Sequence, residues 1–228
     1  MRFAAHILLF VFITSAIFFQ IQYDQNNDLF HAADKHLMLP SAMAVRVGSF
    51  GNVNLVADLI YIWAIQFFAT ESIKNRYDYS VEVFDLITDL NPKFEDPYYV
   101  GSIIIGLNKK DPKNAIRILQ KARKYFKNDY MYDYDSAYYA WYYLKDYKLA
   151  KKYYLQMSQY PNVPKILKYF WINMDMKIAE KIPDLKKAFE MWQQIEKVAK
   201  GRTQKEKAKA HLLQLKYKID RKLFDQYI

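Results

Sequence analysis

Small and apolar residues recur at an interval of about 35 residues through the middle of this chain. The three successive sets are Ser80, Phe84 and Ile87; Ala115, Leu119 and Ala122; and Ala150, Tyr154 and Met157. Within each set the residues lie about one helical turn apart, so they share one face of an α-helix. Such a period is typical of helical hairpins that stack and share a continuous interior, so we expect an all-α chain that forms an α-solenoid.

The composition agrees with a folded helical protein. Hydrophobic residues make up 52% of the 228 residues, and 21 Tyr and 15 Phe supply more ring surface than a disordered chain carries. Only 5 Gly and 7 Pro are present, which argues against the many turns of an all-β fold. The chain has no Cys, which excludes disulfides, thiolate nucleophiles and cysteine-ligated zinc.

The amino terminus carries a long apolar segment. Residues 3–19 contain only His6, Thr14 and Ser15 as polar members, and Ile21 extends the segment to about the length that crosses a bilayer core. No small-residue cleavage site follows it. We therefore expect an uncleaved transmembrane anchor over residues 1–22, with a cleaved signal peptide as the alternative.

The charges that flank this segment predict its orientation. Arg2 precedes it, whereas Asp24 and Asp28 are the first charges after it. The positive-inside rule then keeps the short amino terminus in the cytoplasm. We expect a single-pass protein of the cytoplasmic (inner) membrane whose remaining chain lies on the outer, periplasmic face.

The rest of the chain divides into three expected regions. Residues 23–54 read as a juxtamembrane connector, residues 55–200 as helical repeats, and residues 201–228 as a C-terminal capping helix. The apolar stretch 55–69, with Asn54 as its N-cap, is expected to form a buried helix that pairs with a helix over residues 79–90.

The sequence contains clear signals for helix starts in the later repeats. Asp96 precedes Pro97 and Asp111 precedes Pro112, the pattern of an N-cap followed by proline in the first turn. Further hairpins are expected over residues 135–160, and over 164–181 with 184–200.

The last helix is predicted to begin at a capping box. Thr203 and Glu206 have the spacing of such a box. Lysines surround an apolar stripe in this helix, so it could contact anionic lipid, an acidic partner or nucleic acid, or serve only as the solvated face of a terminal cap.

In these residues the chain resembles the tetratricopeptide repeat family, in the form of a membrane-anchored bacterial protein. The residues that carry the resemblance in the best-matching repeat are Trp141, Tyr142, Tyr147, Ala150, Tyr154 and Pro161. Tyr138 and Met157 depart from the pattern, since both stand where the family has small residues. The resemblance implies a right-handed solenoid of hairpins and covers roughly residues 55–200.

The resemblance also implies a binding surface. In this family the first helix of each hairpin faces the concave, ligand-binding side. Carried over to this chain, that geometry selects the partner-binding residues Tyr98, Ser102, Asp135, Tyr139 and Tyr142. The tyrosines lie at helical spacing, so filling the groove between hairpins is the alternative reading.

No motif for catalysis, cofactor binding or metal binding is recognisable. The chain has no phosphate-binding glycine loop, nucleophile elbow or metalloprotease helix. His31 and His36 bracket Asp34 at a spacing that suits a shared ion poorly. Asp133 and Asp135 fall in a tyrosine-rich stretch and read as solvated turn residues. We expect no enzyme, no cofactor and no small-molecule substrate.

The predicted function is that of a membrane-anchored scaffold or adaptor. It would bind a protein or peptide partner and help to assemble or stabilise a cell-envelope complex of the pilus or secretion type. Two alternatives remain open: an RNA-binding helical-repeat protein, which the basic surplus of 34 Lys and Arg over 24 Asp and Glu allows, and a non-catalytic accessory subunit of a membrane enzyme.

Overall fold

The computed structural model describes residues 14–15 and 39–224, and every regular element in these ranges is helical. The main helices are α3 (Ala42–Gly48), α4 (Val53–Ala69), α5 (Ser80–Leu90), α6 (Asp96–Ile103), α7 (Pro112–Ala122), α8 (Met131–Tyr138), α9 (Tyr147–Met157), α10 (Phe170–Ala179), α11 (Leu185–Val198) and α12 (Arg202–Phe224). The all-α prediction is confirmed, because these ranges contain no β-strand.

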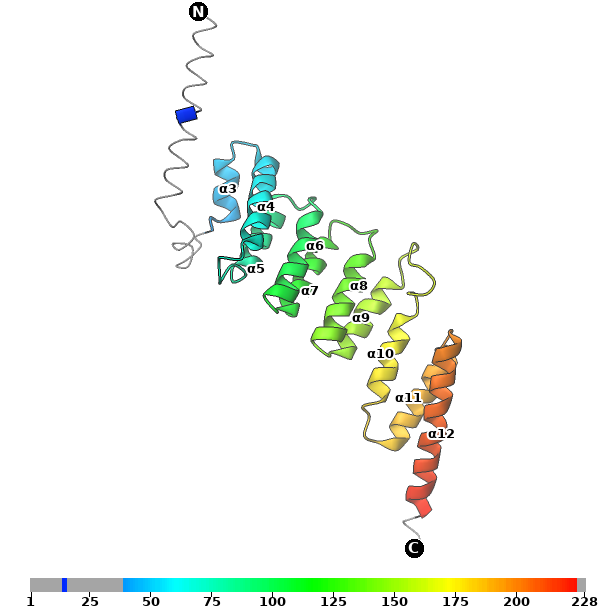
Figure 1. The fold of residues 1–228 in the computed structure, drawn as a ribbon. Helices are drawn as coiled ribbons and strands as arrows, with labels where there is room; N and C mark the ends of the chain where they lie inside the picture. The colour runs from blue at the N-terminus through cyan, green and yellow to red at the C-terminus, as the bar shows by residue number, and fades with distance from the viewer. Residues whose placement is uncertain (1–13, 16–38, 225–228) are drawn as a thin grey trace, which may run out of the picture.

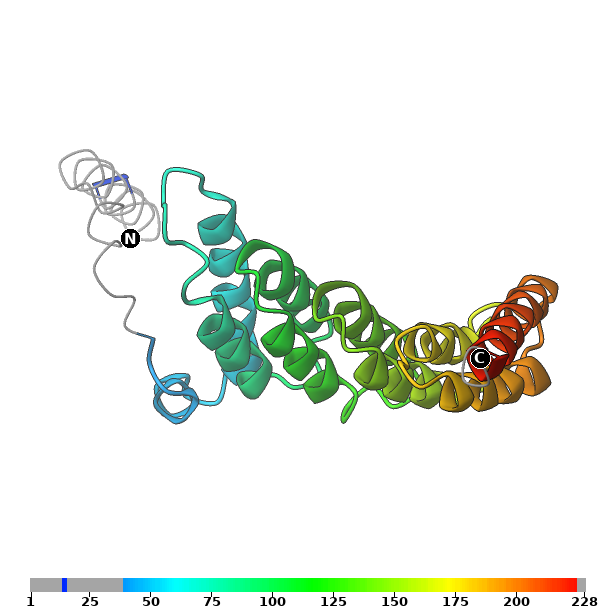
Figure 2. The same cartoon turned by 90° about the horizontal axis from the view of Figure 1, so that it is seen from below.

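Consecutive helices form hairpins that stand in a row (Figure 1). α4 packs with α5, α6 with α7, α8 with α9, and α10 with α11. Each hairpin also packs on the next, and α12 packs along α11 at the end of the row. In Figure 2 the first helices of the hairpins lie on one side of the molecule and the second helices on the other.

Two of the hairpins share an unusual ending of the first helix. α6 continues into the π-helix η1 (Ile104–Asn108), and α8 continues into η2 (Tyr139–Tyr143). After each π-helix one lysine adopts a left-handed conformation, with φ of 60° at Lys110 and 55° at Lys145. The two hairpins therefore repeat the same backbone path 35 residues apart in sequence.

The second helix of each of these hairpins starts with an aspartate cap. The Asp111 side chain accepts a hydrogen bond from the backbone N–H of Asn114, and that of Asp146 accepts one from Leu149. The predicted cap at Asp111 is confirmed, and Asp146 occupies the equivalent place. Asp96, by contrast, lies inside the first turn of α6 and makes no capping hydrogen bond.

The interior of the row is continuous. A single cluster of buried apolar side chains extends from Ala64 on α4 to Met174 on α10, through Leu119 and Tyr154. Rings link neighbouring elements within it: Phe68 stacks on Phe84 at a centroid distance of 5.6 Å. Each hairpin thus buries part of its apolar surface against the next one.

A smaller cluster joins the last hairpin to α12. Trp192 of α11 and Ala208 of α12 are buried there, with Leu212 and Leu215 packed against them. The Trp192 indole also stacks on the His211 ring at 4.2 Å. The apolar stripe predicted for the last helix therefore packs as expected, and this burial lowers the pKa of His211.

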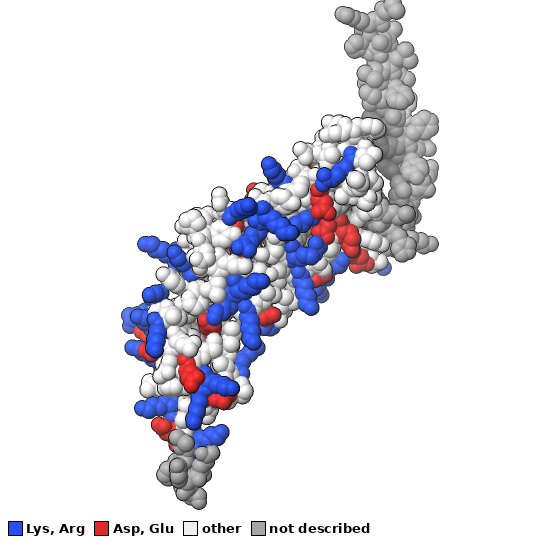
Figure 3. Space-filling model, turned by 180° about the vertical axis from the view of Figure 1, so that it is seen from behind, with Lys and Arg blue, Asp and Glu red and all other residues white. Residues whose placement is uncertain are grey.

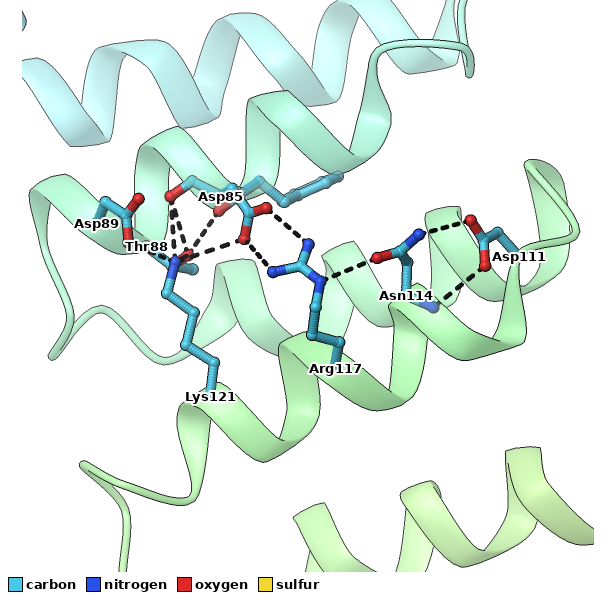
Figure 4. A network of polar contacts seen from close by, with 8 residues as sticks. Asp85, Thr88, Asp89, Asp111, Asn114, Arg117 and Lys121 are labelled. Carbon is cyan, nitrogen blue, oxygen red and sulfur yellow. Dashed lines mark hydrogen bonds and ion pairs between the residues drawn. The ribbon is translucent and has the colours of Figure 1, made fainter. Parts of the chain in front are cut away.

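A polar network joins the second helices of the first two hairpins. Arg117 of α7 donates two hydrogen bonds to the Asp85 carboxylate of α5, at 3.0 and 2.6 Å (Figure 4). Lys121 lies 2.6 Å from an Asp89 carboxylate oxygen and donates to the Thr88 hydroxyl at 2.7 Å. The four charged side chains of this network are partly exposed, whereas Thr88 is buried.

Ion pairs also join the later hairpins to one another, and one of these pairs contains a buried aspartate. Arg123 lies 3.0 Å from Asp133, whose side chain is fully inaccessible to solvent. Lys151 pairs with Asp175 at 2.6 Å. Because these pairs join one hairpin to the next, they help to fix the register between repeats.

Three local predictions are wrong. α8 begins at Met131, so Asp133 lies inside a helix and is buried, not a solvated turn residue. α4 begins at Val53, which places Asn54 inside the helix. α12 begins at Arg202, and Glu206 accepts a hydrogen bond from Arg202 Nε at 2.7 Å, so no capping box forms at Thr203.

The departure expected at Tyr138 has a structural explanation. Gly101 of α6 is buried against Phe84, and the residue 35 positions later, Ser136, is buried at the equivalent place in α8. Tyr138 is exposed. The π-helix shifts the register, so the small position is filled by Ser136 and Tyr138 does not have to fit it.

The predicted transmembrane segment lies outside the described residues, apart from Thr14 and Ser15, which are helical. None of the helices that the structure does describe has the length and apolar character needed to span a membrane.

Candidate partner-binding surface

The outward side of α6 and η1 presents aliphatic residues. Val100 and Ile104 are partly buried there, while Ile103 and Leu107 are 50% and 42% exposed. Ile103 and Leu107 lie one turn apart, so together they form a small apolar patch on the first helix of this hairpin.

The next hairpin presents aromatic residues at the equivalent positions. Tyr138 and Tyr142, 35 positions after Ile103 and Leu107, are 36% and 48% exposed. Their rings stack with a centroid distance of 5.5 Å and an interplanar angle of 4°. We call the set formed by Val100, Ile103, Leu107, Asp135, Tyr138 and Tyr142 the first-helix stripe.

The predicted partner-binding residues separate into two groups. Asp135 is partly exposed and Tyr142 largely so, and both belong to the first-helix stripe. Tyr98, Ser102 and Tyr139 are 0%, 3% and 5% exposed and lie between helices. These three side chains pack inside the protein. The prediction that they form part of an exposed binding surface is therefore wrong.

The buried tyrosines are held by backbone acceptors. The Tyr98 hydroxyl donates to the Pro92 carbonyl at 3.1 Å, and the Tyr139 hydroxyl donates to the Ser102 carbonyl at 2.9 Å. Burial raises the pKa of Tyr139 to about 12. Hydrogen bonds of this kind make a buried tyrosine a packing residue that joins one hairpin to the next.

Aromatic and acidic side chains surround the start of α8. The Tyr99 and Tyr132 rings stack at 4.7 Å, and the Tyr99 hydroxyl donates to the Asp129 carboxylate. Tyr132 donates to Glu95 at 3.3 Å. This part of the surface is therefore acidic and aromatic although the whole chain carries a net charge of +10.

Figure 3 shows many Lys and Arg side chains on the face that is seen from behind. The exposed residues of the second helix α7 include Lys113 and Arg117. Several cations of this helix and its end are already paired, Arg117 with Asp85 and Arg123 with Asp133. Cations are not confined to this face, because Lys145 Nζ lies 4.8 Å from the centroid of Tyr142 in the first-helix stripe.

The first helix of the row, α4, was expected to be buried, but one apolar side of it is exposed. Leu55, Leu59 and Ile62 of α4 are between 54% and 58% exposed, and Trp63 is 38% exposed. No hairpin precedes α4 among the described residues to cover this side.

The part of the chain that the structure describes contains no group of three or more His, Asp or Glu side chains placed to hold a metal ion. No protein-family model matches the chain, and no curated protein matches it either.

Sequence reasoning overlooked Ile103, Leu107 and Tyr138 as surface residues. Their signal was present, because Ile103 and Tyr138, and likewise Leu107 and Tyr142, are one period apart. Tyr98 and Ser102 were chosen from the resemblance to the repeat family, and both lie in the regular α-helical part of α6, before η1.

Proposed function

We propose that this chain is a helical-repeat scaffold, built as a right-handed solenoid of tetratricopeptide-like hairpins, that binds a segment of a partner protein along the first-helix stripe. One observation carries the proposal: equivalent positions of two successive hairpins expose large apolar residues, Ile103 with Tyr138 and Leu107 with Tyr142. A folded monomer gains little from exposing such residues repeatedly, whereas an elongated partner segment could contact them in series.

Protein is favoured over RNA as the partner by the distribution of charge. A single-stranded RNA site combines exposed rings with free cations that follow the backbone. Here the first-helix stripe contains Asp135, on which the charge of Asp129 acts, and among the described residues Lys145 is the one cation that lies over a ring of the stripe. Arg117 and Arg123 on α7 and its end are paired with aspartates. Salt-independent partner binding would agree with this choice, and a steep salt dependence would favour RNA.

The proposed setting is the outer face of a cytoplasmic membrane. The apolar segment 3–21 supports a single-pass anchor, and confinement to the membrane would raise the effective concentration of the scaffold near membrane partners. The exposed apolar side of α4 supports an orientation in which this end of the row lies nearest the bilayer. A role in assembling an envelope complex, or as an accessory subunit of a membrane enzyme, fits such a tethered binding surface.

Site-specific photocrosslinking tests the binding surface. A benzoylphenylalanine replaces Tyr142 in the full chain, expressed in its host membrane, and Tyr217 of α12 serves as the matched control because it is also an exposed tyrosine, at 68%. We expect a discrete crosslinked product from position 142 that disappears in the Leu107→Ala variant, and none from position 217. Equal labelling at both positions, or labelling at 142 that ignores Leu107→Ala, would refute the proposal.

The absence of Cys allows a test of membrane orientation. A single Leu59→Cys substitution carries an environment-sensitive dye, and a single Leu213→Cys on the exposed side of α12 serves as the control. In vesicles that contain the full chain, we expect lipid-borne quenchers to reduce the fluorescence of the dye at position 59 more than at 213. The reverse order would contradict this orientation.

A further inference from the structure

Asp135 has an environment that no other residue of the first-helix stripe shares. Its side chain is partly buried and makes no hydrogen bond or ion pair with any residue in the described ranges. The equivalent position one period earlier is Val100. A carboxylate therefore stands where the neighbouring hairpin has an aliphatic side chain.

The other buried or half-buried aspartates of the described ranges have a cationic partner or accept hydrogen bonds, as Asp111 and Asp129 do. Asp133 pairs with Arg123, Asp175 with Lys151, and Asp85 with Arg117. A partly buried carboxylate is normally paired or hydrogen-bonded, because its desolvation is otherwise uncompensated. Asp135 lacks that compensation within the described part of the chain, although it lies on the surface proposed to meet a partner.

The groups nearest to Asp135 add no cation. Burial and the negative charge of Asp129 raise the pKa of Asp135 to about 6. Burial, and to a smaller extent the charge of Asp135, raise the pKa of two neighbouring phenols, Tyr139 on the same helix segment and Tyr154 on α9. The local field is therefore negative, which attracts a positive group and repels an acidic one.

The rings beside Asp135 are suited to the same kind of group. Tyr138 lies one turn after Asp135 and exposes part of its ring. Tyr142, the next ring in the stack, already receives a cation from the chain itself, because Lys145 Nζ lies 4.8 Å from its centroid. Among the described residues no cation lies over the Tyr138 ring, so this ring remains open to one from outside.

We propose that Asp135 and Tyr138 together receive a lysine or arginine side chain of the bound partner segment, with aliphatic or aromatic neighbours of that cation packing on Leu107 and Tyr142. This inference rests on the proposed function and specifies the chemistry of its partner. The partner segment is basic and apolar. Its cation supplies the ion pair that Asp135 lacks in the free chain, and its apolar side chains cover the rest of the first-helix stripe.

A peptide selection with the full chain in detergent tests this inference. A displayed library of random 12-residue peptides is selected against the wild-type protein, and the enriched peptides are titrated against three variants. Asp135→Asn keeps the shape and removes the charge. Asp58→Asn also removes one negative charge, but at an exposed position of α4 that lies outside the stripe, and it serves as the control. Leu107→Ala reports on the proposed surface itself.

We expect enrichment of lysine or arginine next to apolar residues, and a loss of affinity of about tenfold in Asp135→Asn, typical of one charge-assisted contact. Asp58→Asn should leave the affinity within about twofold, since long-range steering alone is small at physiological salt. Carbodiimide coupling of an enriched lysine peptide should attach it to a tryptic fragment that contains Asp135.

The two proposals fail in different ways. Enriched peptides that lack cations, or that bind Asp135→Asn as tightly as the wild type, while still requiring Leu107, would overturn the cation site and leave the scaffold proposal intact. Peptides whose binding is unaffected by Leu107→Ala would overturn the proposed surface itself. Folding of Asp135→Asn is checked independently by its thermal unfolding.

Discussion

The hairpins α6–α7 and α8–α9 follow the same backbone path but present different chemistry. Both end their first helix in a π-helix, pass through a left-handed lysine and start the second helix at an aspartate cap. On the surface, Ile103 and Leu107 of one hairpin are replaced by Tyr138 and Tyr142 in the other. The backbone pattern thus constrains the interior and the turn, and leaves the outward positions free to vary.

The boundaries of these hairpins differ in the same way. The network between α5 and α7 lies near the surface, with Asp85 and Arg117 side chains 29% and 45% exposed. The pair between Arg123 and Asp133 lies deeper, because Asp133 is wholly buried. An ion pair at the surface contributes little to stability, whereas breaking a buried one leaves an uncompensated charge.

The largest expected effect is a difference in stability between variants of the buried and the surface ion pair. Arg123→Ala should lower the free energy of unfolding by about 3 kcal/mol, because it leaves the buried Asp133 carboxylate without its cation. Arg117→Ala should lower it by no more than about 1 kcal/mol. Urea denaturation of the two variants measures both values. Equal losses would show that the boundaries do not differ in the way their burial indicates.

The equivalent small positions Gly101 and Ser136 should respond differently. A Cβ on Gly101 would come 2.7 Å from Phe84 Cγ, so Gly101→Ala should cost about 2 kcal/mol through overpacking. Ser136→Ala removes a hydroxyl that accepts from Gln120 and donates to the Tyr132 carbonyl, which should cost about 1 kcal/mol. Thermal unfolding of both variants at one pH makes the comparison. A neutral Gly101→Ala would mean that the Phe84 ring can move aside.

The charge at Asp135 should make the stability depend on pH. Its pKa rises from 3.8 to about 6 on folding. The carboxyl group therefore loses its proton at a lower pH in the unfolded chain than in the folded one, and the stability of the fold decreases as the pH rises from about 4 to 6. Asp135→Asn should be more stable than the wild type by roughly 2 kcal/mol above pH 6, with no difference below about pH 4. Val100→Ala, at the equivalent uncharged position, should show a loss that is constant over this range. Denaturation between pH 3.5 and 8 distinguishes the two profiles.

The smallest expected effect concerns the left-handed lysines. Lys110→Gly should stabilise the chain by about 0.5 kcal/mol, because glycine adopts positive φ without strain. Lys145→Gly should be close to neutral, since it also removes the cation that lies over the Tyr142 ring. Differential scanning calorimetry of this pair measures the difference. A larger gain for Lys145→Gly would argue against a contribution from the cation–ring contact.

Much of the fold could be predicted from the sequence because its signals are local. The recurring sets that include Ala115 and Ala150 are buried as expected, and Asp111 caps α7 as its position before Pro112 indicates. A small residue at a close crossing is also a local signal, and the buried Gly101 lies against Phe84 of the preceding hairpin.

The candidate site was predicted less well because it depends on the helical register over a whole helix. A π-helical turn changes which residues face outward, and no residue type marks it in the sequence. Tyr98 and Ser102 lie before η1, and the family resemblance placed them on the surface, although the exposed positions are Ile103 and Leu107. Burial of Asp133 could not be predicted either, since its partner Arg123 comes from the preceding hairpin.

The π-helices η1 and η2 also make the pattern of exposed side chains sensitive to the deletion of a single residue. Deleting one residue from η2 would restore ordinary α-helical spacing there and rotate the preceding part of α8 by about 100° relative to α9. Asp135 and Tyr138 would turn inward, and Ala137 would turn outward. A single deletion in this segment is therefore expected to erase the outward pattern more completely than any single substitution within it.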